Sequence, residues 1–227
     1  MAQLGRMKLY HFPMTRSARV KWLLHELLGD EFDVEVVPLY DGAQHSDTFL
    51  AMNANHAVPV LEFTRDGGES FTMIESGAIV EWLADSYSDR AFAPMPGGTR
   101  ERADYLQIMH FCASWFDMML WQIRVNRDLT PSEQRPQPII DSFMKKIRRE
   151  VEPQLERRLE HGGFATGSRF SAADCVLGHN VRWARFYGLC EQKAFDDYLD
   201  RLAERPAYLA AFADVGNFSL VPPALSG

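Results

Sequence analysis

Long apolar runs and paired cysteines are both missing from this sequence of 227 residues. No segment reaches the roughly 18 uncharged apolar residues that a membrane-spanning helix needs. The first residues also lack the apolar region of a secretory signal. Cys112, Cys175 and Cys190 form no Cys-X-X-Cys pair, and their odd number argues against a disulfide framework. We therefore expect a cytoplasmic protein with reduced thiols and no membrane partner.

Positive charge is also scarce. The formal net charge is −7, and residues 1–90 hold 14 Asp and Glu against 7 Lys and Arg. Nucleic-acid binding needs a cationic surface, so we expect no nucleic-acid partner. The sequence has no His-Glu-X-X-His zinc motif, no Gly-rich nucleotide-binding motif and no Gly-X-Ser-X-Gly nucleophile motif. We expect neither a bound metal nor a redox cofactor.

The sequence does contain two halves of different periodicity. Residues 1–90 predict strand, helix, strand, then two strands and a helix. A right-handed crossover makes the first two strands parallel, and a hairpin with its turn at 66–68 makes the last two antiparallel. This order predicts a thioredoxin-like α+β domain, with a generic α/β arrangement as the alternative. The expected strands are 7–12, 32–36, 58–63 and 71–74.

The segment 91–99 is rich in Pro and Gly and is predicted to be an interdomain linker. Residues 100–227 show helical spacing and predict an all-helical domain. One long helix is expected over 100–127, and a second over about 140–151. Pro153 predicts a kink or a break in the second helix, because proline has no N–H to donate.

A third helix is predicted to begin at Ser171. Ser171 and Asp174 stand at the spacing of a capping box, in which the two ends of the first turn satisfy each other's backbone donors. We expect both residues to have a structural role.

Four segments resemble motifs of the cytosolic glutathione S-transferases and occur in the same order. Lys8–Leu24 is similar to the first strand and helix of that family, and Asn53–Leu61 to the loop before the third strand. Ile74–Ile79 resembles the Glu-Ser glutathione motif, and Arg169–Leu177 resembles the capping box of the sixth helix. The resemblance extends from the first strand to about Asp214. It is to the serine/threonine type, with a theta/delta-like N-terminal motif.

This resemblance implies that glutathione is a co-substrate whose thiol must be activated. A free thiol titrates near ~8.5 and is mostly protonated at neutral pH, and a hydroxyl at a helix N-terminus favours the thiolate. Thr15 and Ser17 are both candidates, and the spacing to the Arg-Val pair at 19–20 favours Thr15. The alternative is that either hydroxyl only caps the helix. His11 stands where a tyrosine-type enzyme has Tyr, and no Cys lies near Arg16, where the cysteine-type class has one.

The resemblance also implies a binding site for the rest of glutathione. The backbone of Val58 pairs with the cysteinyl part like an added strand, followed by Pro59, which the family keeps cis. Glu75 and Ser76 bind the γ-glutamyl ammonium and carboxylate at a helix start, with a helix cap and a solvated glutamate as the alternative. His56 is a candidate for the glycine carboxylate, with simple solvation as its alternative. The residues assigned to glutathione are Thr15, Gln44, His56, Val58, Glu75 and Ser76.

An electrophile site is implied in the second domain. The long helix carries two apolar stripes, whereas a surface helix needs one, so we expect a ligand pocket or a dimer contact there. Core packing is the alternative for most of these residues. The stripe assigned to the electrophile comprises Tyr105, Met109, Cys112 and Phe116.

The sequence thus predicts a homodimeric glutathione transferase that conjugates the glutathione thiolate to small hydrophobic electrophiles, a reaction typical of detoxification. One alternative is a binding or regulatory protein that keeps the fold without catalysis, because fold does not fix function. The other is a glutathione-dependent isomerase, dehalogenase or disulfide reductase.

Overall fold

The computed structural model describes residues 5–65, 67–222 and 225, which form two compact units. The first unit contains the described residues up to Arg90 and also Pro206–Phe218, and the second contains Ala91–Arg205 and the described residues from Ser219. The sequence analysis assigns 206–218 to the second domain. The structure differs because this segment packs its aromatic side chains against the first helix of the first unit.

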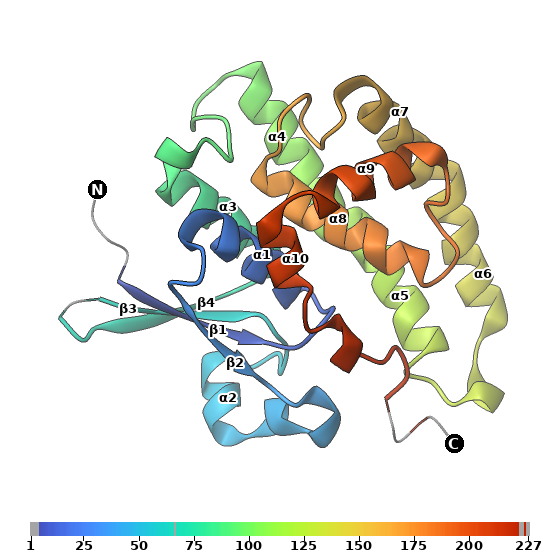
Figure 1. Ribbon diagram of the computed structural model, residues 1–227. Helices are drawn as coiled ribbons and strands as arrows, with labels where there is room; N and C mark the ends of the chain where they lie inside the picture. Colours follow the sequence, from blue (N-terminus) through green and yellow to red (C-terminus); the bar gives the residue numbers. More distant parts are fainter. Residues whose placement is uncertain (1–4, 66, 223–224, 226–227) are drawn as a thin grey trace. The chain divides into compact units, whose positions relative to one another are not determined.

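A four-stranded mixed sheet forms the centre of the first unit (Figure 1). Its strands are β1 Arg6–His11, β2 Asp33–Val36, β3 Val60–Thr64 and β4 Ser70–Ile74, in the spatial order β2-β1-β3-β4. β1 runs parallel to β2 and antiparallel to β3, and β3 runs antiparallel to β4. The predicted thioredoxin-like arrangement is confirmed. Asp66 of the predicted hairpin turn lies outside the described residues.

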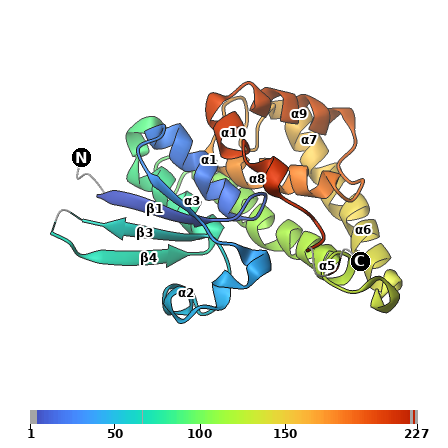
Figure 2. The same cartoon turned by 60° about the horizontal axis from the view of Figure 1, so that its bottom comes forward.

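Helices cover both faces of this sheet. α1 (Ser17–Leu28) and α3 (Ser76–Ser86) lie on one face, and α2 (Asp47–Met52) lies on the other (Figure 2). α1 ends at Gly29, which has a positive φ of 63°, a conformation that glycine adopts readily after a helix. α2 has six residues and is too short to show a helical period, so the sequence analysis missed it.

α10 (Pro206–Ala211) completes the first unit. Trp22 of α1 is fully buried and makes edge contacts with the rings of Tyr208 and Phe212, at centroid distances of 4.9 and 6.1 Å. Burying large aromatic side chains removes much apolar surface from water. This packing explains why a segment far along the chain belongs to the first unit.

The second unit is helical. The predicted run 100–127 is present and consists of two α-helices with a wider π-helical turn, Phe111–Phe116, between them. Pro153 follows another π-helical turn, Ile147–Val151, and lies in the first turn of the next helix, where its missing N–H is tolerated. The helix therefore continues past Pro153 and does not break. The helices are α4 Arg100–His110, α5 Asp117–Arg127, α6 Gln137–Lys146, α7 Glu152–Gly162, α8 Ala172–Arg185 and α9 Lys193–Ala203.

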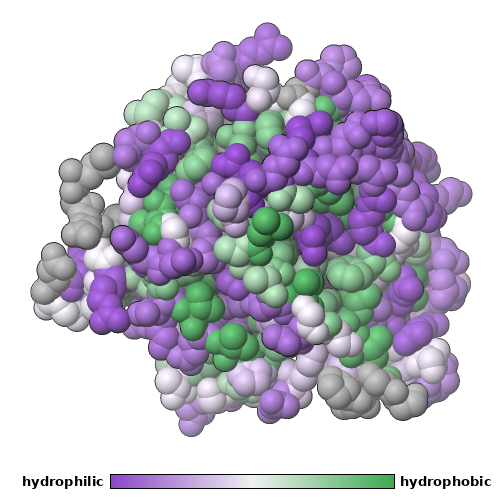
Figure 3. Space-filling model, in the orientation of Figure 1, coloured by the Kyte–Doolittle hydropathy of each residue, from purple (hydrophilic) through white to green (hydrophobic). Residues whose placement is uncertain are grey.

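The predicted capping box is present at the start of α8. Asp174 is fully buried and accepts four hydrogen bonds, from Ala165 N at 2.7 Å, Ser171 N at 2.8 Å, Ser171 Oγ at 3.0 Å and Tyr198 Oη at 2.9 Å. One carboxylate thus holds together the start of α8, the preceding loop and α9. The outer faces of α7 and α9 are hydrophilic in Figure 3.

Among the described residues, no helix has both the length and the apolar character that a membrane crossing requires. Over the same ranges, no group of three or more His, Cys, Asp or Glu side chains is arranged to hold a metal ion.

Candidate functional site

Three strand ends meet at one edge of the sheet in the first unit. The register pairs Tyr10 with Val60 and Val60 with Ile74, so that the ends of β1, β3 and β4 lie in one row. Two helices begin just beyond this row, α1 at Ser17 and α3 at Ser76. Helix N-termini present unpaired backbone N–H groups and a partial positive charge. This edge therefore suits an anionic ligand.

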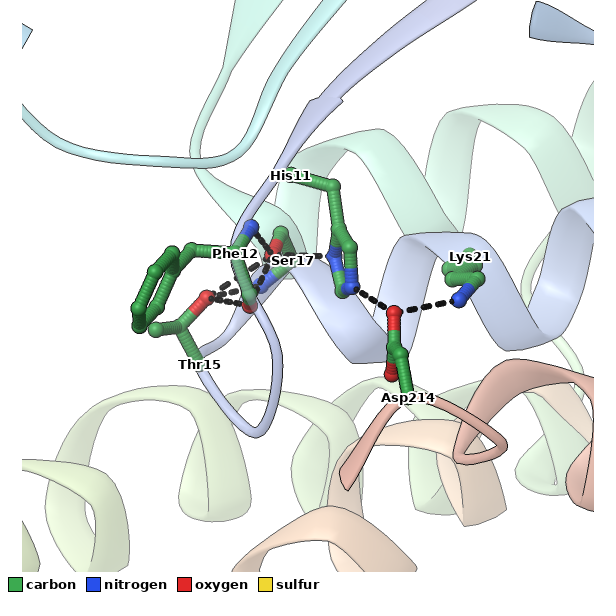
Figure 4. Close-up of polar contacts among 6 residues, drawn as sticks. All are labelled: His11, Phe12, Thr15, Ser17, Lys21 and Asp214. Atoms are coloured by element: carbon green, nitrogen blue, oxygen red, sulfur yellow. Dashed lines mark hydrogen bonds and ion pairs between the residues drawn. The ribbon is translucent and has the colours of Figure 1, made fainter. Parts of the chain in front are cut away.

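A cluster of short hydrogen bonds closes the turn before α1 (Figure 4). Thr15 Oγ1 lies 2.8 Å from the Phe12 carbonyl oxygen and 2.8 Å from Ser17 Oγ. The Phe12 N–H donates to Ser17 Oγ at 3.2 Å, and the Ser17 N–H donates to Thr15 Oγ1 at 3.4 Å. Both hydroxyls thus support the start of the helix, which is the capping role that the sequence left as an alternative.

His11 joins this cluster to a carboxylate from the far end of the chain. Its Nδ1 lies 2.7 Å from Ser17 Oγ, and its Nε2 lies 3.0 Å from Asp214 Oδ2. Lys21 Nζ donates to the same carboxylate oxygen at 2.7 Å. Figure 4 shows these side chains in a continuous line from Thr15 to Lys21. Asp214 follows α10 and belongs to the first unit.

Burial and neighbouring charges determine the protonation states of Asp214 and His11. Partial burial alone raises the pKa of Asp214, but the hydrogen bonds from His11 and Lys21 outweigh it and lower the pKa to about 2. Burial lowers the pKa of His11, and the bond to Asp214 opposes this lowering only in part. At neutral pH the carboxylate is charged and the ring is neutral. Nε2–H therefore donates to Asp214, and Nδ1 accepts the Ser17 hydroxyl proton.

These directions distinguish the two candidate hydroxyls. Ser17 is fully buried, and its hydroxyl lies 2.7 Å from His11 Nδ1 and 3.1 Å from the Phe12 carbonyl oxygen. The shorter contact is to the ring nitrogen that accepts, so we assign the Ser17 proton to His11. Thr15 is partly exposed and directs its proton to Phe12 O or to Ser17 Oγ, both of which a stronger acceptor can replace. A ligand at the sheet edge can therefore reach the hydroxyl of Thr15 but not that of Ser17.

The other predicted glutathione residues lie at the same edge. The Val58–Pro59 peptide bond is cis and buried directly before β3. Glu75 is exposed and has a positive φ of 69° at the start of α3. Ser76 is buried, and its Oγ accepts a hydrogen bond from Arg19 Nη1 at 3.1 Å. That bond ties the start of α3 to α1.

Gln44 and His56 lie on the chain segments that flank α2. The exposed His56 ring lies 4.8 Å from the ring of His45, measured between centroids. Gln44 Oε1 is buried and has no hydrogen-bond partner within the part of the chain that the structure describes. A carboxylate would need the donors of the Gln44 NH2 group or of the His56 ring, and His56 is the more exposed of the two residues.

The four residues assigned to the electrophile lie in the core of the second unit. Tyr105, Met109, Cys112 and Phe116 have no exposed surface, and Asn180 of α8 donates a hydrogen bond to the backbone oxygen of Cys112 at 2.7 Å. Their burial favours the packing alternative. The second apolar stripe of the same run is only partly covered: Ile108 is buried, whereas Trp115 is 41% and Met118 40% exposed. In the sequence the two stripes look equally apolar, so the pattern alone could not distinguish them.

A cavity of about 580 Å³ lies elsewhere in the second unit, between the segment after Arg90 and the loop before α8. Its lining includes Arg100, Glu101, Asp104 and Arg169. These charged side chains do not suit a hydrophobic electrophile.

Sequence reasoning missed His11, Lys21 and Asp214 as parts of the site. In the sequence His11 stands out only because it takes the place of a tyrosine, and Lys21 lies on the helix that the motif covers. A histidine at the end of an apolar strand, directly before the motif turn, is the one signal that the sequence offers for this cluster. No sequence signal pointed to Asp214, which lies 203 residues from His11.

Comparison with known proteins identifies both units. Residues 9–91 match the family model for the glutathione S-transferase N-terminal domain, and residues 137–215 match the model for the C-terminal domain. Among curated proteins, the chain is 28% identical over 204 residues to the disulfide-bond oxidoreductase YfcG of Escherichia coli. The alignment covers 88% of this chain and 91% of that protein.

Solved structures show the same likeness. A glutathione transferase from Methylococcus capsulatus superposes with a TM-score of 0.77 at 28% identity, over 93% of this chain and all of that one. A glutathione transferase from Pseudomonas putida, which has one glutathione disulfide bound per subunit, gives a TM-score of 0.78 over 92% of this chain and 91% of that one. Its identity of 22% shows a shared fold.

Proposed function

This chain belongs to the glutathione S-transferase family, and on that premise we propose that it binds glutathione and transfers its thiolate sulfur to small hydrophobic electrophiles. We assign it to the serine/threonine type, with Thr15 as the group that stabilises the thiolate. The observation that carries this proposal is the partly exposed Thr15 hydroxyl at the start of α1, on the sheet edge where Val58 and Glu75 also lie.

The proposed chemistry follows from that position. The Thr15 hydroxyl turns from Phe12 O to the sulfur and donates to it, and the N-terminus of α1 adds partial positive charge. Both effects favour S⁻ over SH. Lowering the thiol pKa by about two units corresponds to about 2.7 kcal/mol of thiolate stabilisation. The thiolate then attacks an electrophilic carbon, and the electron pair of the broken bond leaves with the leaving group or is protonated in an addition.

A substrate panel with glutathione tests this function. We expect turnover with aryl halides or epoxides, and the class that reacts identifies the electrophile. Turnover of a peroxide alone would instead be a reduction that oxidises two glutathiones to the disulfide and forms no sulfur–carbon bond. Retention on immobilised glutathione without turnover of any class would favour the regulatory alternative. No retention and no turnover would reject glutathione as the ligand.

A disulfide reaction is the second candidate, and the similarity to a disulfide-bond oxidoreductase favours it. Cys112, Cys175 and Cys190 form no disulfide and are fully buried. Because buried thiols cannot reach a substrate, such a reaction would use glutathione alone. The glutathione thiolate attacks one sulfur of the substrate disulfide, and the other sulfur leaves as a thiolate. A second glutathione then releases the product and forms glutathione disulfide. Faster turnover of a mixed disulfide than of every electrophile in the panel would support this candidate.

Glu75→Gln should weaken glutathione binding without changing the stability of the fold. Glu75 is exposed and its side chain makes no cap hydrogen bond, so the carboxylate is available for the ligand's ammonium. Losing a charged hydrogen-bond partner costs about 1.5–3 kcal/mol, or one to two decades in affinity. Calorimetric titration and thermal melts measure the two effects.

Glu69→Gln is the matched control, because Glu69 is an exposed glutamate of the same unit that pairs with Arg65 in the hairpin. It makes the same charge change and should leave affinity unaltered. Equal affinities for both variants and the wild type would remove Glu75 from the site. We avoid Ser76→Ala as a binding probe, because Ser76 Oγ accepts from the buried Arg19, so its loss also disturbs the fold.

A homodimer and a cytoplasmic location complete the proposal. The dimer rests on the family and on the prevalence of closed two-fold assemblies among oligomers. The cytoplasmic location rests on the buried cysteines, none of which forms a disulfide and which suit a reducing compartment. Light scattering that gives the mass of one 25.9 kDa chain at micromolar concentration would reject the dimer.

A further inference from the structure

Four polar groups of the first unit form one hydrogen-bonded chain that runs from Thr15 at the sheet edge through the interior to the partly exposed Asp214 (Figure 4). Successive atoms are 2.8 Å apart from Thr15 Oγ1 to Ser17 Oγ, 2.7 Å from there to His11 Nδ1, and 3.0 Å from His11 Nε2 to Asp214 Oδ2. Each distance is that of a formed hydrogen bond. Ser17 and His11, the two middle members, are fully buried, so protein groups alone surround them.

Burying a histidine is costly unless its ring nitrogens are paired, and both His11 nitrogens are paired here, Nδ1 with Ser17 and Nε2 with Asp214. A helix cap needs one hydroxyl and does not need this extension to Asp214. Asp214 also lies 203 residues from His11 in the sequence. These features call for a role beyond closing the turn.

We propose that these hydrogen-bonded groups carry the thiol proton of bound glutathione to His11, so that the thiolate and an imidazolium form together. The inference rests on the proposed function, because it needs glutathione sulfur at Thr15. The S–H proton passes to Thr15 Oγ1, the Thr15 proton passes to Ser17 Oγ, and the Ser17 proton passes to His11 Nδ1. One S–H bond breaks and one N–H bond forms, and no other reactant takes part.

The hydrogen bonds after this transfer all point toward the sulfur. Before it, Ser17 donates to His11; after it, His11 donates to Ser17, Ser17 to Thr15 and Thr15 to S⁻. A chain of donors aligned in one direction strengthens each of its bonds. The proton transfer therefore both creates the thiolate and turns the Thr15 hydroxyl into its donor.

The charges around His11 suit a proton acceptor that is neutral at rest. Asp214 lies against Nε2, where its negative charge stabilises the imidazolium, and Lys21 pairs with the same carboxylate from α1. Burial keeps the ring neutral before glutathione binds, because it lowers the pKa of His11. The new thiolate then supplies the second negative charge that favours protonation. An analogous thiolate–imidazolium pair forms where Cys and His act together.

A serine, a histidine and an aspartate also form the triad that activates the serine nucleophile of hydrolases. That role does not fit Ser17, which is fully buried and whose oxygen accepts the Phe12 N–H. Thr15 is the member of the hydrogen-bonded series that is exposed at the sheet edge, and a ligand would meet the series there.

Counting protons during glutathione binding tests the inference. Titration calorimetry in buffers of different ionisation enthalpy gives the net number of protons released, and ultraviolet absorbance gives the thiolate formed. For the wild type near pH 7 we expect thiolate without matching proton release, because His11 takes the proton. S-methylglutathione has no thiol, so its binding should give neither thiolate absorbance nor proton release.

Two variants interrupt the chain at different places. Ser17→Ala keeps Thr15 but separates it from His11, and Asp214→Asn keeps all hydroxyls but removes the charge that stabilises the imidazolium. In both we expect a smaller thiolate fraction at neutral pH, with one proton released for each thiolate formed. His25→Gln is the matched control, because His25 lies on α1 and takes no part in the hydrogen-bonded series. It should behave as the wild type.

The outcomes separate this inference from the proposed function. Wild-type release of one proton per thiolate overturns the transfer to His11 and leaves Thr15 activation standing. Unchanged proton counts in Ser17→Ala and Asp214→Asn overturn it as well, because the acceptor would then be another group. Glutathione binding without any thiolate absorbance overturns both proposals. A merely structural His11 would not change the proton count in any variant.

Discussion

Thr15→Ala should lower the conjugation rate about 10²–10³-fold, the loss typical of removing one donor that stabilises an oxyanion in a transition state. Glutathione affinity should change far less, because Glu75 and the Val58 backbone remain. The Thr15 hydroxyl is partly exposed and exchangeable between two acceptors, so it is free to serve a developing thiolate. Steady-state kinetics and the pH dependence of thiolate absorbance measure the effect, and the thiol pKa in the complex should rise.

Thr15→Ser is the matched control for this experiment. It keeps the hydroxyl and should retain most of the activity. If Thr15→Ala leaves the thiol pKa unchanged, Thr15 is not the donor. In that case Ser17 becomes the candidate again, and the direction we assign to the Ser17–His11 bond is wrong.

Asp174→Ala should be the most destabilising single substitution among those we consider. It leaves four donors without an acceptor, two from Ser171 and one each from Ala165 and Tyr198, in a place that water does not reach. Removing one partner from a buried charged network costs about 3–5 kcal/mol. For a chain of this size that corresponds to a fall in Tm of roughly 6–20 °C. Thermal and denaturant melts measure both quantities.

Thr99→Ala gives the scale for an ordinary helix cap. Thr99 Oγ1 accepts the Arg102 N–H at the start of α4 at 3.2 Å, and its loss should cost about 1 kcal/mol. A loss no larger than this for Asp174→Ala would show that the residue is a simple cap and does not hold the loop and α9.

The contribution of Asp174 to stability should also depend on pH. Burial raises the pKa of Asp174 to about 6, although its four hydrogen bonds oppose the rise. The folded state then binds more protons than the unfolded state between about pH 4 and pH 6, so stability from this group falls as the pH rises through that window. The gap between wild type and Asp174→Ala should therefore be larger near pH 4 than above pH 6. A gap that grows with pH would mean that the hydrogen bonds outweigh burial.

The sequence predicts most of the first unit because its signals are local. Pro13 after β1, Gly29 after α1 and the alternation in the hairpin each mark an element, and the handedness rule for parallel strands supplies the topology. The residues proposed to bind glutathione lie at one sheet edge for the same reason, since the order of the strands fixes which ends are neighbours. α2 lacked such a signal because six residues are too few for a period.

The remaining features depend on contacts that no local pattern encodes. Asp214 follows a short helix in a polar stretch, and its partner His11 is 203 residues away. The stripe with Tyr105 and Phe116 is as apolar as the stripe with Trp115 and Met118, and packing against α8 decides which of them is buried. Tertiary packing overrides the sequence pattern in both cases.

The return of residues 206–218 to the first unit sets the order in which the protein can be completed during synthesis. Trp22 has no cover from Tyr208 or Phe212 until almost the whole chain has left the ribosome. At about 5–20 residues per second, the interval between Arg90 and Phe218 is roughly 6–25 s. During that interval the nascent sheet and its first helix expose an apolar surface and lack the carboxylate of Asp214. The first unit is therefore completed only when α10 arrives and covers Trp22.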